Sequence, residues 1–369
     1  MPSAVIRANA HSLTWWMEAA SKVIDRHEAI LLDLCRRVLA LPLDSTTGIH
    51  ENGEQIKDPV GEAINHPIGH VAQALLNLWL KRTPNDNDSL PEDIEPFFTQ
   101  MSDVGIGRFR HGRVLLASRL IALFRVDRPW TEKHLLPLFD WEVSSNEAKA
   151  VWEGFLWSPR LYRPLLIAFK SQFLSTAGHY DELGEHGRQF AAFLTYAALD
   201  PVEGYTPADF RTAIGALPQH GLHEVARALS QALEGAGEQR EDYWKNRVRP
   251  FWQEIWPKSR DLSSNSIAES LAVLSIAAGG EFPSALDAVV DWLRPIEHLH
   301  HVVHSLHESG LSSCFPETAL RLLDAILADQ RWAPRELGQC LDAIAKAMPN
   351  LQKDHRYQRL AEYVRRHGN

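Results

Sequence analysis

Apolar residues recur every three or four positions along nearly the whole chain, and this period predicts α-helices. A first stripe runs through a segment from about residue 13 to 41, which ends at Pro42; it consists of Val23, Ile24, Ala29, Ile30, Leu34 and Val38. The stripe predicts one long amphipathic helix or a close pair of helices. Alternating apolar and polar runs bounded by hairpin turns, which are typical of strands, are missing from the sequence. The expected fold class is all-α.

Further helices are expected at short intervals, with local start signals. The ranges are 107–126, 131–139, 145–156, 161–176, 186–199, 207–216, 219–235, 239–255, 264–278, 283–293, 300–309, 316–329, 335–347 and 355–367. Helix starts are indicated by Asp58 before Pro59, by Ser144 three residues before Glu147, and by Thr206. Pro67 begins another helix. Short connections make successive helices spatial neighbours, so we expect stacked antiparallel helix pairs in an α-solenoid of the HEAT or TPR kind. A compact helical globule is the alternative.

A weak internal repeat supports the solenoid. Trp256 before Pro257, Trp292 near Pro295 and Trp332 near Pro334 recur at spacings of 36 and 40 residues, which is the period of helix-pair repeats. Residues 44–58 are expected to form a polar loop, and residues 83–91 an exposed linker. With glycines at 235 and 237, these breaks divide the chain into an N-terminal helical region (1–90), a helical-repeat region (91–236) and a C-terminal helical-repeat region (237–369).

Composition narrows the class of protein. The 369 residues include 47 acidic and 38 basic ones, a formal charge of −9, which argues against a surface devoted wholly to nucleic acid. The three cysteines, Cys35, Cys314 and Cys340, are too few and too dispersed for a disulfide framework or a four-thiolate zinc site, which favours a reducing compartment. No apolar run of about 18 residues and no signal-peptide pattern is found. We expect a cytoplasmic protein that does not span a membrane.

A histidine cluster is the most conspicuous polar feature of the sequence; it contains His298, His300, His301, His304 and His307. On a helix, His300, His304 and His307 share one face. Two such imidazoles could hold zinc if Glu297 or Glu308 supplied a third ligand. The His-Glu-x-x-His pattern of zinc hydrolases is absent, and a solvated or partly buried helix is the favoured interpretation. No metal and no other cofactor is expected.

The segment 240–260 is the richest in aromatic and basic residues together. Trp244, Val248, Phe251 and Ile255 have helical spacing and are expected in the core. Trp252 and Trp256 lie on a neighbouring face, where they either pack between repeats, which we favour, or form an exposed anchor. In the second case the partner-binding residues would be Tyr243, Arg247, Arg249, Trp252 and Trp256. Together with Arg240 and Lys245, the same tryptophans would also suit a stacking platform for single-stranded nucleic acid.

Two other polar groups have structural explanations. The first group consists of six arginines that cannot all share one helix face: Arg108, Arg110, Arg113, Arg119, Arg125 and Arg128. We interpret them as solvated side chains around an apolar stripe rather than as a groove that binds anions. A second group could host acid–base chemistry, but a loop and an acidic first helical turn, bent at Gly184 and Gly187, are favoured; it contains His179, Tyr180, Asp181, Glu182, Glu185, His186 and Arg188. Catalytic motifs such as Gly-x-Ser-x-Gly, Ser-x-x-Lys and Cys-x-x-Cys are missing.

Several strings are familiar in combination: Gly107 to Leu120, Leu135 to Trp141, Gly154 to Leu161, Leu183 to Ala192 and Glu238 to Asp261. They resemble the uncharacterised helical domain at the C-terminal end of large bacterial sirtuin-like proteins that are associated with anti-phage defence. The resemblance covers about residues 105 to 345. It implies a sensor, scaffold or oligomerisation region beside a separate NAD-degrading domain, whose glycine-rich loop and catalytic residues have no counterpart in this sequence.

The expected function is therefore a non-enzymatic helical-repeat scaffold or sensor that binds a protein partner, such as a phage component or an effector domain. The alternative is a helical-repeat nucleic-acid binder or base-acting enzyme that uses Arg240, Lys245, Arg247, Trp252 and Trp256. A metal hydrolase built on His300 and His304 ranks last.

Overall fold

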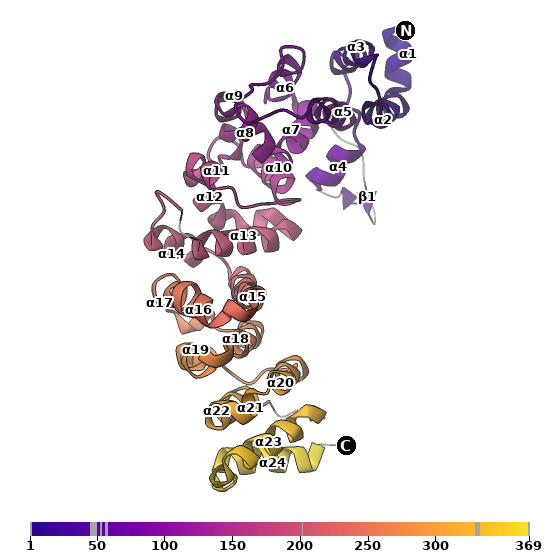
Figure 1. The fold of residues 1–369 in the computed structure, drawn as a ribbon. Coiled ribbons are helices and arrows are strands. Elements are labelled where there is room, and N and C mark those ends of the chain that lie inside the picture. Colours follow the sequence, from indigo (N-terminus) through magenta and orange to yellow (C-terminus); the bar gives the residue numbers. More distant parts are fainter. Residues whose placement is uncertain are drawn as a thin grey trace. The chain divides into compact units, whose positions relative to one another are not determined.

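The computed structural model describes residues 2–44, 50–51, 54–55, 58–200, 202–328 and 333–367. Over these ranges every element of regular secondary structure is a helix except one antiparallel strand pair, β1 (His50–Glu51) with β2 (Glu54–Gln55), inside the segment expected to be a loop (Figure 1). The predicted all-α class is confirmed.

The chain divides into two compact units, residues 1–189 (unit 1) and 190–369 (unit 2). The predicted region boundaries at 90 and 236 fall inside these units and stay predictions.

Unit 1 is built from short helices. Its α-helices are α1 (Ser3–Ala8), α2 (Ala10–Ser21), α3 (Glu28–Leu39), α4 (Pro59–Asn65), α5 (Pro67–Lys81), α6 (Glu95–Met101), α7 (Arg110–Ala117), α8 (Leu120–Val126), α9 (Arg128–His134), α10 (Ser145–Leu156), α11 (Arg163–Ala168) and α12 (Lys170–Ser175). Its 3-10 segments are η1 (Gly107–Phe109), η2 (Leu136–Phe139) and η3 (Thr176–His186). Helix α2 packs on α5, and α7 packs on both α4 and α10. The α7–α10 crossing is close, because a Cβ atom on Gly154 would lie 2.3 Å from the carbonyl oxygen of Val114.

Helix α13 (Gly187–Leu199) continues from unit 1 into unit 2. The α-helices that follow are α14 (Pro207–Gly215), α15 (Gln219–Gly235), α16 (Arg240–Tyr243), α17 (Arg249–Glu254), α18 (Asn265–Ala277), α19 (Phe282–Val289), α20 (Leu299–Glu308), α21 (Leu311–Cys314), α22 (Pro316–Ile326), α23 (Arg335–Ala347) and α24 (His355–His367). A π-helical turn, η5 (Trp244–Val248), joins α16 to α17. The 3-10 segments are η4 (Gly237–Gln239), η6 (Arg260–Leu262), η7 (Gly279–Glu281), η8 (Val290–Trp292) and η9 (Pro349–Lys353).

The helices of unit 2 follow one another in two rows. Helix α15 packs on α18, α18 on α20, and α20 on α23. In the other row α17 packs on α19, α19 on α22, and α22 on α24. Figure 1 shows α15, α18 and α20 on one side of this unit and α17, α19 and α22 on the other. One hydrophobic core cluster extends from α18 to α24 between the rows.

Local start signals were predicted well. The Asp58 carboxylate accepts a hydrogen bond from the Gly61 amide at 2.8 Å, as expected for a helix N-cap. Thr206 and Asp209 form a complete capping box. Ser144 caps α10, but only half of its box exists, because the Glu147 side chain turns away to bind Arg110 and Arg113.

The structure adds detail to two expectations about the N-terminal third. Of the two alternatives for the segment 13–41, the pair of helices is found, α2 and α3, but three residues of the predicted apolar stripe are exposed, Val23 by 76%, Ile30 by 61%, and Ala29. The expected linker over 83–91 is tied to unit 1, because the amides of Asn87 and Ser89 donate to the carbonyl oxygens of Arg125 and Val126 at 2.9 and 3.0 Å. These bonds link segments distant in sequence, which composition alone does not reveal.

In the described ranges no single helix is both long and apolar enough to cross a membrane. Two consecutive helical segments, Asn265–Ala277 and Gly279–Trp292, are long and apolar enough only when they are taken together, and the chain bends by 116° between them.

Substitution of a buried and an exposed tryptophan of the same helix tests the packing of the core of unit 1. Trp152 is fully buried in α10, where its indole donates to the Phe139 carbonyl oxygen at 3.1 Å, and Trp157, at the end of the same helix, is 52% exposed. We expect Trp152→Ala to lower the free energy of unfolding by about 3–5 kcal/mol, because it leaves a large cavity. Trp157→Ala, the control, should change it by less than about 0.5 kcal/mol. Urea denaturation of both variants measures this, and equal losses would contradict the packing described.

Candidate functional site

The predicted partner-binding tryptophans lie in the core of unit 2. Trp252 is 6% exposed and Trp256 only 1%. Their rings stack with centroids 4.9 Å apart, and both meet the Trp292 ring edge-on, at 6.1 and 5.4 Å. The exposed-anchor alternative is therefore wrong for these two residues, and neither can stack on a nucleic-acid base. Their spacing reflects packing between successive helix pairs, whereas Trp332 lies outside the described residues.

The remaining residues of the predicted partner surface flank this aromatic cluster. Tyr243 is half-buried, and burial raises the pKa of its hydroxyl. Arg247 is half-buried and Arg249 is exposed. As partner-binding residues, these three stay predictions. Two basic side chains that were considered for nucleic-acid binding are engaged in ion pairs. Arg240 lies 3.8 Å from the adjacent Glu241, and Lys245 lies 3.0 Å from a glutamate of η7.

The histidine cluster lies on α20 and the turn before it. His300 and His304 are exposed, and His307 is half-buried. The nearest ionic contact is with α23, where the His304 Nδ1 atom lies 3.9 Å from a carboxylate oxygen of Glu336. Among the described residues, no three or more His, Cys, Asp or Glu side chains are grouped so as to hold a metal ion. His301, from the same cluster, points into a different feature, a groove across three helices.

That groove crosses α15, α18 and α20 and has a volume of about 430 Å³. It is lined by His223, Arg227, Ser230, Gln231, Glu234, Glu269, Ser270, Val273 and His301. Helix α15 supplies most of these residues, because positions 223, 227, 231 and 234 repeat on one face. The floor is closed where the Ser230 hydroxyl donates to the Ser270 carbonyl oxygen at 2.8 Å. The result is a polar groove over the row of α15, α18 and α20.

Neighbouring helices of this groove run in the same direction. The Gln219 amide donates to the carbonyl oxygens of Leu262 and Ser263, at 3.2 and 3.3 Å, and Ser230 bonds Ser270 further along. Because both partners advance together along the chain, α15 and α18 are parallel.

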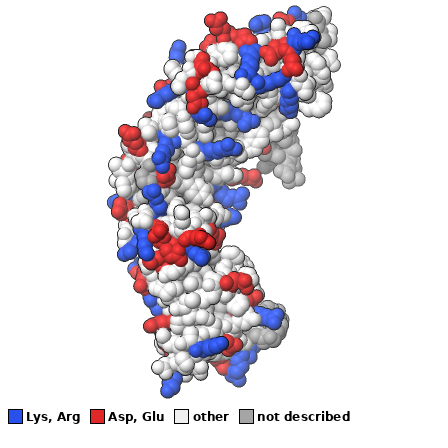
Figure 2. Space-filling view, viewed as in Figure 1, with Lys and Arg blue, Asp and Glu red and all other residues white. Residues whose placement is uncertain are grey.

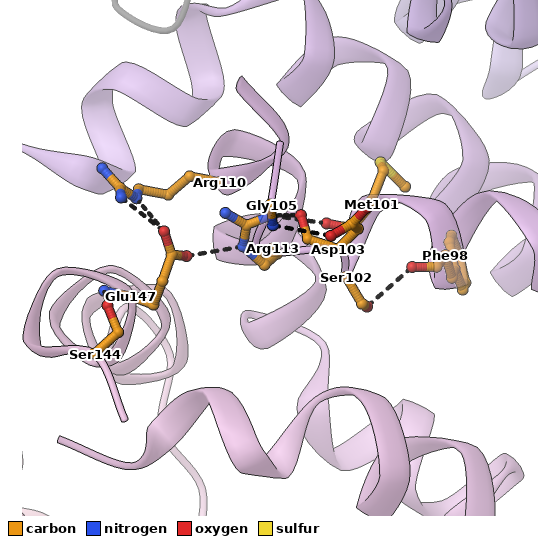
Figure 3. Close-up of polar contacts among 9 residues, drawn as sticks. All are labelled: Phe98, Met101, Ser102, Asp103, Gly105, Arg110, Arg113, Ser144 and Glu147. Carbon is orange, nitrogen blue, oxygen red and sulfur yellow. Dashed lines mark hydrogen bonds and ion pairs between the residues drawn. The ribbon is translucent and has the colours of Figure 1, made fainter. Parts of the chain in front are cut away.

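Unit 1 contains a different polar feature, a buried ionic cluster that consists of Arg110, Arg113 and Glu147 (Figure 3). Arg113 is fully buried on α7, and its Nε donates to Glu147 on α10 at 2.8 Å. Its Nη1 donates to the carbonyl oxygens of Met101 and Asp103, at 3.1 and 2.8 Å, at the end of α6. Arg110 binds the other carboxylate oxygen of Glu147 at 2.7 Å.

This cluster joins three helices rather than forming a reactive site. Burial acts to raise the pKa of Glu147, but the hydrogen bonds and charges of Arg113 and Arg110 outweigh it and hold this pKa below its ordinary value. A carboxylate that stays ionised and fully engaged is not available as a base. Arg113 closes the C-terminal end of α6, where carbonyl groups lack helical partners. The interpretation of Arg113 as a solvated side chain is therefore wrong.

A second carboxyl group of α10, that of Glu153, has a raised pKa, in contrast to Glu147. Glu153 is 4% exposed, and its nearest cation, Lys149, is 3.6 Å away. Burial raises the pKa of Glu153 to about 7, against the smaller opposing effect of Lys149. His186, in η3, has its pKa lowered by burial, opposed by the charges of Asp58 and Glu185. No nucleophile is joined to Glu153 or His186 by hydrogen bonds that the structure describes.

The polar constellation over 179–188 has mostly structural contacts. The His179 ring stacks on Trp141 with centroids 4.4 Å apart, and its Nδ1 lies 2.7 Å from Glu182. Tyr180 is buried. The bend was located correctly, since Gly184 has a φ of +54° and α13 begins at Gly187.

Sequence reasoning missed the groove and the buried charges for one reason. Both depend on side chains brought together from different helices, such as Arg113 and Glu147 across 34 residues and Ser230 and Ser270 across 40. The only available signal for Arg113 was its place directly before the apolar run Val114 to Ala117. For the groove, the signal was the polar face of α15, which carries His223, Arg227 and Gln231 above a buried stripe.

Comparison with known proteins gives little further guidance. The chain is 30% identical over 130 residues to an uncharacterized protein, y4cA, from Sinorhizobium fredii. This match covers 34% of the chain and 11% of the relative, so the chain spans about a ninth of the length of that protein. No family model matches the sequence, and no solved structure matches it at a significant level.

The buried ionic cluster can be tested by neutralising its acid. We expect Glu147→Gln to lower the free energy of unfolding by about 3–5 kcal/mol, because it leaves the Arg113 charge buried without a counter-charge. Glu142→Gln, an exposed position just before α10, is the control and should change stability by less than about 0.5 kcal/mol. Urea denaturation at pH 7 measures both. A loss below about 1 kcal/mol for Glu147→Gln would contradict this role of Arg113.

The raised pKa of Glu153 predicts how the stability of the fold depends on pH. Between its ordinary pKa of 4.5 and its folded value of about 7, the folded chain keeps a proton that the unfolded chain has released. The contribution of Glu153 to stability therefore falls as pH rises through this window. Glu153→Gln removes this titration, so it should be close to neutral at pH 5 and stabilising at pH 8, by on the order of 2 kcal/mol. Urea denaturation at both values measures the difference, and a constant difference would contradict the assignment.

Proposed function

We propose that the chain is a non-enzymatic helical-repeat scaffold, an α-solenoid in unit 2, that binds a protein partner along the row of α15, α18 and α20. The observation that carries the proposal is the narrow range of sequence separations over which distant parts of unit 2 make contact. Hydrogen bonds between distant side chains or backbone groups in the described part of unit 2 span 29 to 44 residues. Each such bond joins one helix pair to the next.

Individual bonds support this offset along the whole unit. Trp244 donates to Ser284 across 40 residues, Arg321 pairs with Asp287 across 34, and Arg359 pairs with Asp324 across 35. In a compact globule, contacts would instead join segments at many different separations. A repeating offset close to the length of one helix pair is what stacking in one direction produces.

Repeat arrays of this kind offer an extended side surface for recognition. In unit 2 the aromatic side chains fill the interior, and the open groove lies over α15, α18 and α20. On the face of the described residues that Figure 2 shows, basic and acidic side chains are mixed. This mixture suits a protein surface better than a phosphate backbone, which needs clustered positive charge.

The biological setting is proposed from the resemblance alone. The strings over 105–345 imply a helical region that works beside a sirtuin-like NAD-degrading effector in anti-phage defence. A binding module of this size is consistent with a relative in which the matched segment is 11% of a longer protein. In this setting, the chain would recognise a phage component or hold the effector, and the catalysis would belong to the other domain.

Site-specific cross-linking tests the proposed function. We place the photoreactive residue benzoylphenylalanine at Gln231 in the groove, and at the matched position Gln253, which is exposed on α17. The full chain is expressed and irradiated in its native cells, and cross-linked proteins are identified by mass spectrometry. We expect one protein to be cross-linked from position 231 and not from position 253.

Three results would contradict the proposal: cross-linking only from position 253, cross-linking only to nucleic acid, and no cross-linking from either position. The purified variants must give the circular dichroism spectrum of the unmodified chain, which shows that the substitutions leave the helices intact.

A further inference from the structure

The groove over α15, α18 and α20 has features that specify the class of partner segment. We propose that it binds an extended segment of a protein partner and that Glu234 and Glu269 receive a lysine or arginine side chain of that segment. The inference rests on the proposed function and specifies the chemistry of its binding surface.

The charges in the groove favour a cationic side chain. Glu234 and Glu269 make no ion pair with any residue that the structure describes. The one arginine of the groove, Arg227, already faces Glu224 at 3.7 Å. The groove therefore offers two uncompensated carboxylates and one arginine that has its own counter-charge. A charge-assisted hydrogen bond from an ammonium or guanidinium group would satisfy these carboxylates.

The cation must be part of a larger molecule. Within the described residues, no three or more His, Cys, Asp or Glu side chains are grouped so as to hold a metal ion, so a cationic side chain suits the two carboxylates better than a bare divalent cation. The floor includes Val273, which is 8% exposed and offers an apolar surface beside the carboxylates. Lysine and arginine carry aliphatic stems that pack on such surfaces while the charged end reaches an acid.

The dimensions of the groove suit an extended chain. Its lining residues on α15 run from His223 to Glu234, which is about 16 Å at the rise of an α-helix. An extended segment advances about 3.3 Å per residue, so about five residues span this distance. Gln231 lies between the two ends and carries an amide that can both donate to and accept from a peptide backbone. The volume of about 430 Å³ is within the usual range for ligand sites.

A peptide array tests the chemistry directly. Seven-residue peptides with a varied central residue are probed with the purified full chain, and the best binder is labelled with fluorescein for anisotropy. We expect the array to select lysine or arginine at the centre. The double variant Glu234→Gln with Glu269→Gln should weaken binding by about tenfold or more, since a charged hydrogen bond contributes on the order of one power of ten in affinity.

Two further variants make the test specific. The control is Glu254→Gln with Glu317→Gln, which removes the same charge from exposed positions on α17 and α22 and should bind as the unmodified chain does. The reversal Glu234→Lys with Glu269→Lys should change the selected central residue from basic to acidic. A reversal cannot arise from loss of folding, so it keeps the proposal testable if the neutral variant is unstable.

Selection of acidic or apolar peptides, unchanged binding by Glu234→Gln with Glu269→Gln, or preferential binding of an RNA oligonucleotide would overturn the inference. The protein identified by cross-linking separates this failure from that of the proposed function. If that protein still binds the neutral variant with full affinity, the binding surface stands and the role of the two carboxylates is wrong. If no protein and no peptide binds the unmodified chain, the proposed function itself is wrong.

Discussion

Burial of apolar helix faces against helices further along the chain is the constraint on which unit 2 depends. Helices α15, α20, α22 and α23 are only a few turns long and carry a buried apolar face on one side, which neighbouring helices cover. The cluster of Trp252, Trp256 and Trp292 shows the consequence, since rings from one pair fill the space against the following one. Hydrogen bonds at an offset of 29 to 44 residues then fix the register between pairs.

The same constraint explains why aromatic density does not mark the surface that we propose for binding. Large rings bury the most apolar area per residue, so packing between helices recruits them to the interior. What remains on the row of α15, α18 and α20 is polar, with a groove that carries two uncompensated carboxylates. In unit 1, buried charge serves structure instead, because the Nε and Nη1 groups of Arg113 join α7 to Glu147 on α10 and to the carbonyl oxygens at the end of α6.

The sequence predicted those features that depend on neighbours a few residues away. The N-caps at Asp58 and Thr206, the bend at Gly184 and the bounds of α10, α15, α23 and α24 are local, and the structure agrees with them. Features that depend on distant residues could not be predicted. The burial of Arg113 requires Glu147, and the raised pKa of Glu153 requires the packing around α10. The groove itself exists only once three helices are stacked.

Carboxyl footprinting with a water-soluble carbodiimide and glycine ethyl ester tests the central claim most directly. The rate of labelling at each glutamate is measured by mass spectrometry with and without the cross-linked partner, once this protein is purified. The account predicts that the partner slows labelling of Glu234 and Glu269 and leaves Glu254 and Glu317 unchanged. Unchanged labelling in the groove, together with protection on α17 or α22, would contradict it.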